Sequence, residues 1–247
     1  ATVEQADRSV FTTPGAARLY RERYPASADR IMVLENGYDE ESFVEAEHGD
    51  DLDEPLNDGC VTLLHSGIVY PSERDPTQLF AALAQMALRG STLPGEVKIR
   101  FRAAVHDTLL QRLAAEHGVE PFIEVLPAIP YADALQEMLR ADALLVLQAA
   151  NCNEQIPAKI YEYLRAHRPI VCLTDPAGDT AMVLRRAGVD VIGRLDSSED
   201  IARLLPAFFA AVRSQHASLP RPEEVQRASR SGRAETLAGQ LDRLTAV

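Results

Sequence analysis

Residues 143–164 read ALLVLQAANCNEQIPAKIYEYL, and they pass from an apolar run through a polar loop into a helical pattern. The apolar run predicts a strand over 141–148 that is buried on both faces. Pro157 suits the first turn of a helix, where its missing N–H costs nothing, so we expect a helix over 157–166. A buried strand followed directly by a helix is typical of a parallel sheet covered by helices.

The rest of the chain repeats this alternation of strand and helix. Further strands are expected over 61–67, 97–105, 121–127, 168–174 and 189–193. Further helices are expected over 76–88, 109–118, 131–141, 179–188 and 197–214. Six such units predict an α/β fold: a doubly wound, parallel, Rossmann-like sheet with helices on both faces. In the common strand order 3-2-1-4-5-6, the binding crevice lies between the carboxyl ends of the first and fourth strands.

The sequence divides on pattern and composition into residues 1–44, 45–59, 60–215 and 216–247. The third segment holds the six units, and the first predicts a strand, a helix and a second strand. The second segment is an acidic linker, and its triplet Asp51-Leu52-Asp53 has the spacing of a DxD metal motif. We interpret that triplet as solvated linker charge. The last segment predicts a polar helix over 225–244, too thinly apolar to stand alone, which should lie across another surface.

Composition limits the class of ligand. Apolar residues make up 46% of the 247 residues, which is enough for a full core. The net charge of −12 excludes a broad basic surface for nucleic acid, so an anionic ligand needs a local basic pocket or a helix N-terminus. The three cysteines have neither zinc spacing nor a pairing pattern, which is typical of a reducing cytosol.

The start of the helix at Pro157 can bind an anion. The free N–H groups of Ala158, Lys159 and Ile160 point out of the helix end, and the helix dipole adds to their effect. A diphosphate placed there also favours a nearby cation. Arg74, in the loop after the first strand, is the candidate, with Lys159 and Arg102 behind it.

Two carboxylates flank this helix start. A carboxylate has two oxygens that accept hydrogen bonds, so Glu162 suits a vicinal diol such as a ribose. Glu154 suits hydroxyl groups on the other side of the diphosphate. The alternative is that both glutamates only interact with the helix dipole. His65, which ends the first strand, is either a ligand contact or a hydrogen-bonded structural histidine.

Several motifs together resemble one family. Glu154 and Glu162 are separated by seven residues, and the family carries this signature between its fourth strand and the next helix. Three further segments agree with the family: VLENGYDEESF (33–43), LLHSGIVYPSERDPTQLFAAL (63–83) and VLPAIPYADALQEMLRADALLVL (125–147). The chain resembles the C-terminal, donor-binding domain of the group 1 retaining GT-B glycosyltransferases, in the branch that builds bacterial surface polysaccharides.

The resemblance implies a nucleotide-diphosphate-sugar donor and assigns roles to residues. Glu162 would hold the ribose, and Glu154 would contact the sugar. Glu154 and Arg74 would carry the catalytic contribution of this half, and no metal or other cofactor is expected. The remaining donor contacts are Gly67, Ile156, Ala158 and Lys159 for the diphosphate, and Ile129 and Pro130 for the base. The chain departs from the family at Ile68, where many members are basic, and at Arg74-Asp75, where many have Lys-Gly.

The resemblance also implies a larger enzyme. Residues 1–44 would end an N-terminal, acceptor-binding domain, and the last helix would cross back onto that domain. We therefore expect a donor-domain fragment of a hexosyl- or other glycosyltransferase, inactive alone. The acceptor would be a sugar or lipid-linked sugar, and the enzyme would be cytoplasmic, with peripheral association at the inner membrane. A non-catalytic nucleotide-sugar binding module and a GT-B-type sugar-nucleotide epimerase are the alternatives.

Overall fold

A computed structural model describes residues 2–49 and 52–245. Its main sheet consists of β3 (Val61–Ser66), β4 (Val97–Arg102), β5 (Ile123–Leu126), β6 (Ala143–Leu147), β7 (Ile170–Leu173) and β8 (Ile192–Gly193). The strands are all parallel and lie in the order β5-β4-β3-β6-β7-β8. This is the 3-2-1-4-5-6 order, so the predicted fold class is confirmed and β3 and β6 are neighbours.

Helices cover both faces of this sheet. One face packs against α4 (Thr77–Leu88), α5 (Asp107–His117) and α9 (Ser198–Arg213). The other face packs against α6 (Tyr131–Arg140), α7 (Lys159–Ala166) and α8 (Asp179–Arg186). All five residues of β6 are buried, because both of its faces are covered. Strand β4 alternates instead: Val97, Ile99 and Phe101 enter the core beneath α4 and α5, and charged side chains take the opposite face.

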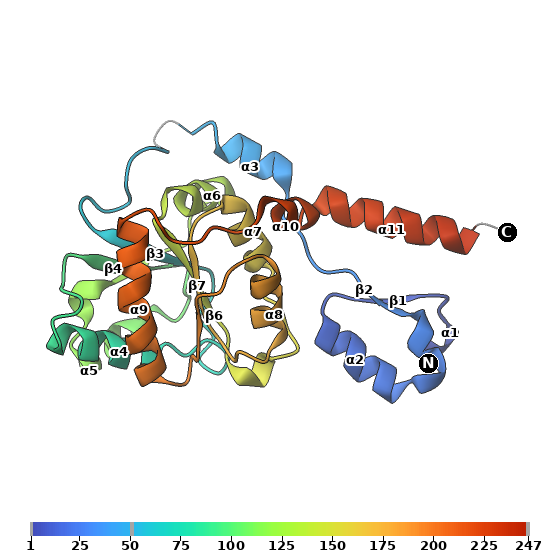
Figure 1. Ribbon diagram of the computed structural model, residues 1–247, viewed down its shortest axis with the longest axis horizontal. Helices are drawn as coiled ribbons and strands as arrows, with labels where there is room; N and C mark the ends of the chain where they lie inside the picture. The colour runs from blue at the N-terminus through green and yellow to red at the C-terminus, as the bar shows by residue number, and fades with distance from the viewer. Residues whose placement is uncertain (1, 50–51, 246–247) are drawn as a thin grey trace.

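The N-terminal residues form a separate unit. It comprises α1 (Thr2–Gln5), β1 (Ser9–Phe11), α2 (Pro14–Arg23), the 3-10 helix η1 (Pro25–Arg30) and β2 (Ile31–Val33). Strands β1 and β2 pair in parallel in their own two-stranded sheet. Helix α3 (Glu40–Ala46) follows and returns the chain to the main sheet domain (Figure 1). Within the described residues, no helix is both long enough and apolar enough to cross a bilayer.

The C-terminal segment differs from the prediction. The single helix expected over 225–244 is two helices, α10 (Pro222–Arg227) and α11 (Arg230–Thr245). The break is held by Tyr38, whose N–H donates to Ala228 O at 3.1 Å and whose carbonyl accepts from Arg230 N at 2.8 Å. A Cβ on Gly37 would lie 2.7 Å from Ala228 O, so this contact requires glycine. The long-range pairing with residues 37–38 overrides the local helical pattern.

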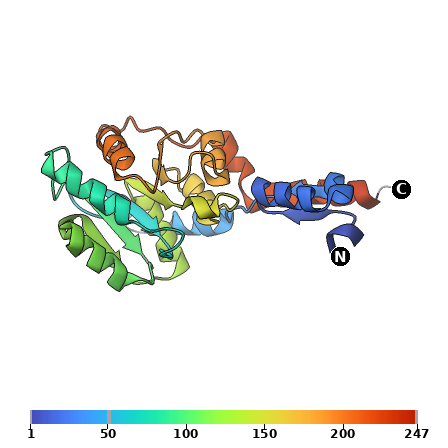
Figure 2. The same cartoon turned by 90° about the horizontal axis from the view of Figure 1, so that it is seen from below.

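Helix α11 extends away from the main sheet and runs beside the N-terminal unit (Figures 1 and 2). It has no buried residue. A groove of about 370 Å³ separates it from the first strands, and apolar side chains from both sides line the groove: Val10, Met32, Leu237, Leu241 and Leu244.

Candidate functional site

The carboxyl ends of β3 and β6 meet at the switch point of the sheet, since Leu63 pairs with Ala143. The loop after β3 begins at Gly67, whose φ of +113° favours glycine. The loop after β6 leads to α7. These two loops form the candidate site.

Lys159 and His65 are paired in this crevice. The Nζ of Lys159, the first residue of α7, lies 3.1 Å from His65 Nε2. On its other side, His65 Nδ1 lies 3.0 Å from Leu145 O, so Nδ1 carries the proton and donates, and Nε2 accepts from Lys159. His65 is fully buried, and burial followed by the nearby Lys159 holds its pKa well below the usual 6.5. His65 is thus a neutral, hydrogen-bonded histidine. Of the two interpretations given to it from the sequence, a ligand contact or a structural histidine, the structure supports the second.

The pKa of Lys159 is also lowered. Burial, with a further contribution from the positive charge of Arg74, lowers the pKa of Lys159 from 10.5 to about 7, and Glu162 opposes this shift. A Cβ on Gly67 would lie 3.1 Å from Lys159 Nζ, so the loop glycine leaves room for this side chain. Gly67, in the loop after β3, and Lys159, at the start of α7, are therefore neighbours in the folded chain.

Arg74 stabilises its own loop. Its Nη1 donates to Ile68 O at 2.7 Å, and its guanidinium lies 5.2 Å from the ring centroid of Tyr70. Its Nε is buried and has no hydrogen-bond partner in the described part of the chain. One donor of this arginine is therefore left unsatisfied near Lys159.

The start of α7 differs from the predicted one. The helix begins at Lys159, two residues later than expected, with Ala158 as its N-cap. Ile160 N donates to Pro157 O at 3.0 Å in a tight turn, so the prediction of a free N–H at Ile160 is wrong. The N–H groups of Ala158 and Lys159 make no backbone hydrogen bond within residues 2–49 and 52–245. Ile156 is buried among core residues, so only its backbone can meet a ligand.

Glu162 is linked to the loop that was assigned to the base. Its Oε1 accepts a hydrogen bond of 2.8 Å from the hydroxyl group of Tyr131, which directly follows Ile129 and Pro130. Burial, with the nearby carboxylate, raises the pKa of Tyr131, so the phenol keeps its proton and donates. Sequence reasoning missed Tyr131, although its position next to Pro130 was the available signal.

Glu154 lies where the N-terminal unit meets the main domain. Its side chain is 49% exposed, and its Oε1 lies 3.7 Å from Arg18 Nη2. Its backbone carbonyl accepts from Thr13 Oγ1 at 2.7 Å. Next to it, Gly15 N donates to Asp179 Oδ2 at 2.6 Å. Sequence reasoning missed these contacts, because they join residues more than 130 positions apart.

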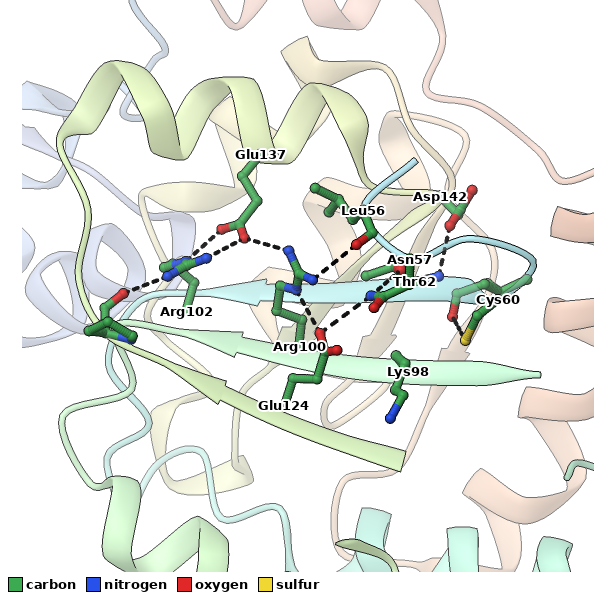
Figure 3. Close-up of polar contacts among 12 residues, drawn as sticks. Leu56, Asn57, Cys60, Thr62, Lys98, Arg100, Arg102, Glu124, Glu137 and Asp142 are labelled. Carbon is green, nitrogen blue, oxygen red and sulfur yellow. Dashed lines mark hydrogen bonds and ion pairs between the residues drawn. The ribbon is translucent and has the colours of Figure 1, made fainter. Parts of the chain in front are cut away.

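A charge cluster around the buried Glu137 holds the loop of residues 127–130, here called the base loop, from the side of β4 (Figure 3). The guanidinium of Arg102 donates through Nε and Nη2 to Glu137 at 2.8 and 2.7 Å, and through Nη1 to Pro127 O at 2.8 Å. Arg100 also pairs with Glu137 at 3.0 Å. The prediction that Arg102 stands behind Arg74 as a phosphate cation is wrong, since Glu137 and Pro127 engage its guanidinium. Its role is to fix the loop that reaches Ile129 and Pro130.

A cavity of about 700 Å³ adjoins the site at the same edge of the sheet. It is lined by residues of the loops after β3, β6, β7 and β8 and of the start of α4: Asp75, Thr77, Gln78, Ala149, Ala150, Asp175, Pro176, Arg194, Leu195 and Asp196. Asp51 of the DxD triplet lies outside the described residues. Within those residues, no group of three or more His, Cys, Asp or Glu side chains is arranged to hold a metal ion.

Comparisons with known proteins identify the fold. No protein-family model and no curated protein matches the chain. A glycosyltransferase from Rickettsia africae ESF-5 matches in structure with a TM-score of 0.74 at 14% identity, over 98% of this chain and 64% of that one. Sucrose-phosphate synthase from Thermosynechococcus elongatus matches with a TM-score of 0.71 at 14% identity, over 99% of this chain and 60% of that one. Anabaena Alr3699/HepE in complex with UDP and glucose matches with a TM-score of 0.69 at 15% identity, over 96% of this chain and 64% of that one.

These matches establish that the chain has the α/β fold of a Rossmann-like half of the GT-B glycosyltransferases. The chain spans only about 60–64% of the length of these three structures.

Proposed function

We propose that this chain binds the nucleotide-diphosphate sugar for a retaining glycosyltransferase. The observation that carries the proposal is the meeting of Gly67, Lys159 and the start of α7 at the switch point, with Arg74 close enough to lower the pKa of that lysine. Parallel α/β sheets bind ligands at this position. In a chain with a net charge of −12, these groups form a local site for an anion.

The diphosphate lies against the open N–H groups of Ala158 and Lys159 and beside the ammonium group of Lys159. The positive charge of Arg74, which already acts on Lys159, adds to the attraction for the diphosphate. During transfer the bond from the sugar to the diphosphate breaks, and its electron pair stays with the diphosphate. Donors that are already in place stabilise the charge that develops there without reorganisation. This is the catalytic contribution of Arg74.

The rest of the donor lies on either side of the diphosphate. The ribose binds Glu162, and the base lies against the loop at Ile129 and Pro130, which the Arg102–Glu137 cluster holds in place. The sugar faces Glu154. The complex of Alr3699/HepE with UDP and glucose supports a donor of this chemical class.

The acceptor is bound by a second domain, in agreement with the partial coverage of the similar structures. That domain covers the apolar groove between α11 and the first strands. The acceptor is a sugar or a lipid-linked sugar of a cell-surface polysaccharide or glycolipid. The whole enzyme works in the cytoplasm, at the inner membrane where the acceptor is lipid-linked.

Calorimetric titration of the chain with UDP, GDP and ADP tests the proposal. We expect one of them to bind, and Glu162→Ala to weaken it at least about tenfold, because hydrogen bonds to a charged acceptor are lost. Glu199→Ala is the matched control, since Glu199 is an exposed carboxylate in the first turn of α9. Absence of binding by all three nucleotides, or equal affinity in Glu162→Ala and Glu199→Ala, overturns the proposal.

A further inference from the structure

Tyr131 connects two parts of the proposed donor site. It is the first residue of α6 and directly follows the base loop at Pro130. Its hydroxyl group crosses to the neighbouring helix α7 and donates to Glu162 Oε1 at 2.8 Å. Tyr131 is 49% exposed, so a ligand can reach its side chain.

The hydrogen bond leaves capacity on Glu162. A carboxylate offers about four acceptor positions on its two oxygens, and the phenol occupies one of them. Within residues 2–49 and 52–245, the carboxylate of Glu162 makes no other hydrogen bond and no ion pair. The second oxygen, Oε2, is therefore open to the two hydroxyl groups of a ribose.

The position of Tyr131 is itself fixed. Glu137, six residues further along α6, is buried and binds the guanidinium groups of Arg100 and Arg102 on β4 (Figure 3). Arg102 also binds Pro127 O, at the other end of the base loop. The chain is thus anchored on both sides of Tyr131, at Pro127 and at Glu137, which fixes the backbone from which its side chain extends.

We propose that Tyr131 is the positioning residue of the ribose site, which holds the Glu162 carboxylate ready for the sugar hydroxyls and couples that carboxylate to the base loop. This inference rests on the proposed function. A glutamate side chain that is free to rotate loses conformational entropy when it binds. Tyr131 removes part of that cost in advance, and the benefit appears only when the ligand carries the hydroxyl groups that Glu162 accepts.

The test crosses one protein change with one ligand change. Tyr131→Phe keeps the ring and removes the hydroxyl group, and 2′,3′-dideoxy-UDP keeps the base and diphosphate and removes the ribose hydroxyls. Affinities of UDP and 2′,3′-dideoxy-UDP are measured for both proteins, with the guanosine and adenosine pairs in parallel. Tyr24→Phe is the matched control, because Tyr24 lies in the N-terminal unit, directly after α2.

We expect Tyr131→Phe to weaken UDP, or whichever ribonucleotide binds, about threefold to tenfold, the range for one hydrogen bond. The dideoxy analogue should bind both proteins equally. An equal loss for both ligands overturns the role of Tyr131 and leaves the proposed function standing. Tighter UDP binding by Tyr131→Phe also overturns it, because the phenol would then occupy the place of a ribose hydroxyl. Absence of all nucleotide binding by the unaltered chain overturns the proposed function and this inference together.

Discussion

The protonation of Lys159 offers the sharpest quantitative prediction. Burial and Arg74 lower its pKa from 10.5 to about 7, while Glu162 acts in the opposite direction. His65 faces the same ammonium group and stays neutral across this range, because its own pKa lies well below 6.5. The free protein therefore holds Lys159 largely uncharged at pH 8.5.

The consequence for stability follows from proton counting. Between pH 7 and pH 10.5 the unfolded chain keeps the lysine proton and the folded chain has lost it. Folding stability therefore rises with pH across this window and is lowest, with respect to this group, below pH 7. A shift of this size corresponds to a pH-dependent contribution of about 5 kcal/mol. Lys159→Met should remove this rise.

Binding of a diphosphate should reverse the shift. The negative charge favours the ammonium form, so at pH 8.5 binding should take up close to one proton. The uptake equals the slope of the calorimetric binding enthalpy against the ionisation enthalpy of the buffer.

The chain suits a direct assay, because it contains only two lysines, Lys98 and Lys159. Labelling lysine with 13C at Cε gives two NMR signals, and Lys159→Arg identifies the one that belongs to the crevice. A Lys159 signal with a midpoint near pH 7 in the free protein supports the reasoning. A midpoint near 10.5, or binding without proton uptake at pH 8.5, refutes it.

Two further changes test the site's framework. Glu137→Gln should cost about 3–5 kcal/mol in denaturant unfolding, because two largely enclosed guanidinium groups lose the buried anion that they share. Glu116→Gln, at an exposed ion pair, should cost under about 0.5 kcal/mol. Comparable losses in the two variants would contradict the cluster's role. Gly67→Ala should destabilise the protein by about 1–3 kcal/mol and more than Gly90→Ala, since both glycines have positive φ but only Gly67 has a side chain against it. Equal losses at the two glycines would show that Lys159 does not crowd that position.

Much of the main domain was predictable from periodicity. The apolar run around β6 predicted a central strand, and the six alternating units predicted a doubly wound parallel sheet, for which the observed strand order is the common one. Predicted boundaries were too long where a turn competes with the strand. The strand expected over 121–127 begins only at Ile123, because Glu120–Phe122 form a 3-10 turn around Pro121.

The parts that could not be predicted depend on long-range contacts. Nothing local indicates that Arg102 is neutralised by Glu137, which lies 35 positions away on another element. Likewise, the break between α10 and α11 depends on Tyr38, nearly 200 positions earlier. The strand order alone was enough to predict that the loops after β3 and β6 meet at the switch point. The pairing of Lys159 with His65 and of Glu162 with Tyr131 needed the folded chain.

Amide chemical-shift mapping in solution tests most directly whether the nucleotide binds at the switch point of the sheet. The chain is titrated with UDP, GDP and ADP, and shifts are assigned residue by residue. We predict that the nucleotide that binds shifts the amides of Gly67, Ala158, Lys159 and Ile129. Shifts confined to the adjoining cavity, at Thr77 and Arg194, or no shifts with any of the three, would contradict binding at the switch point.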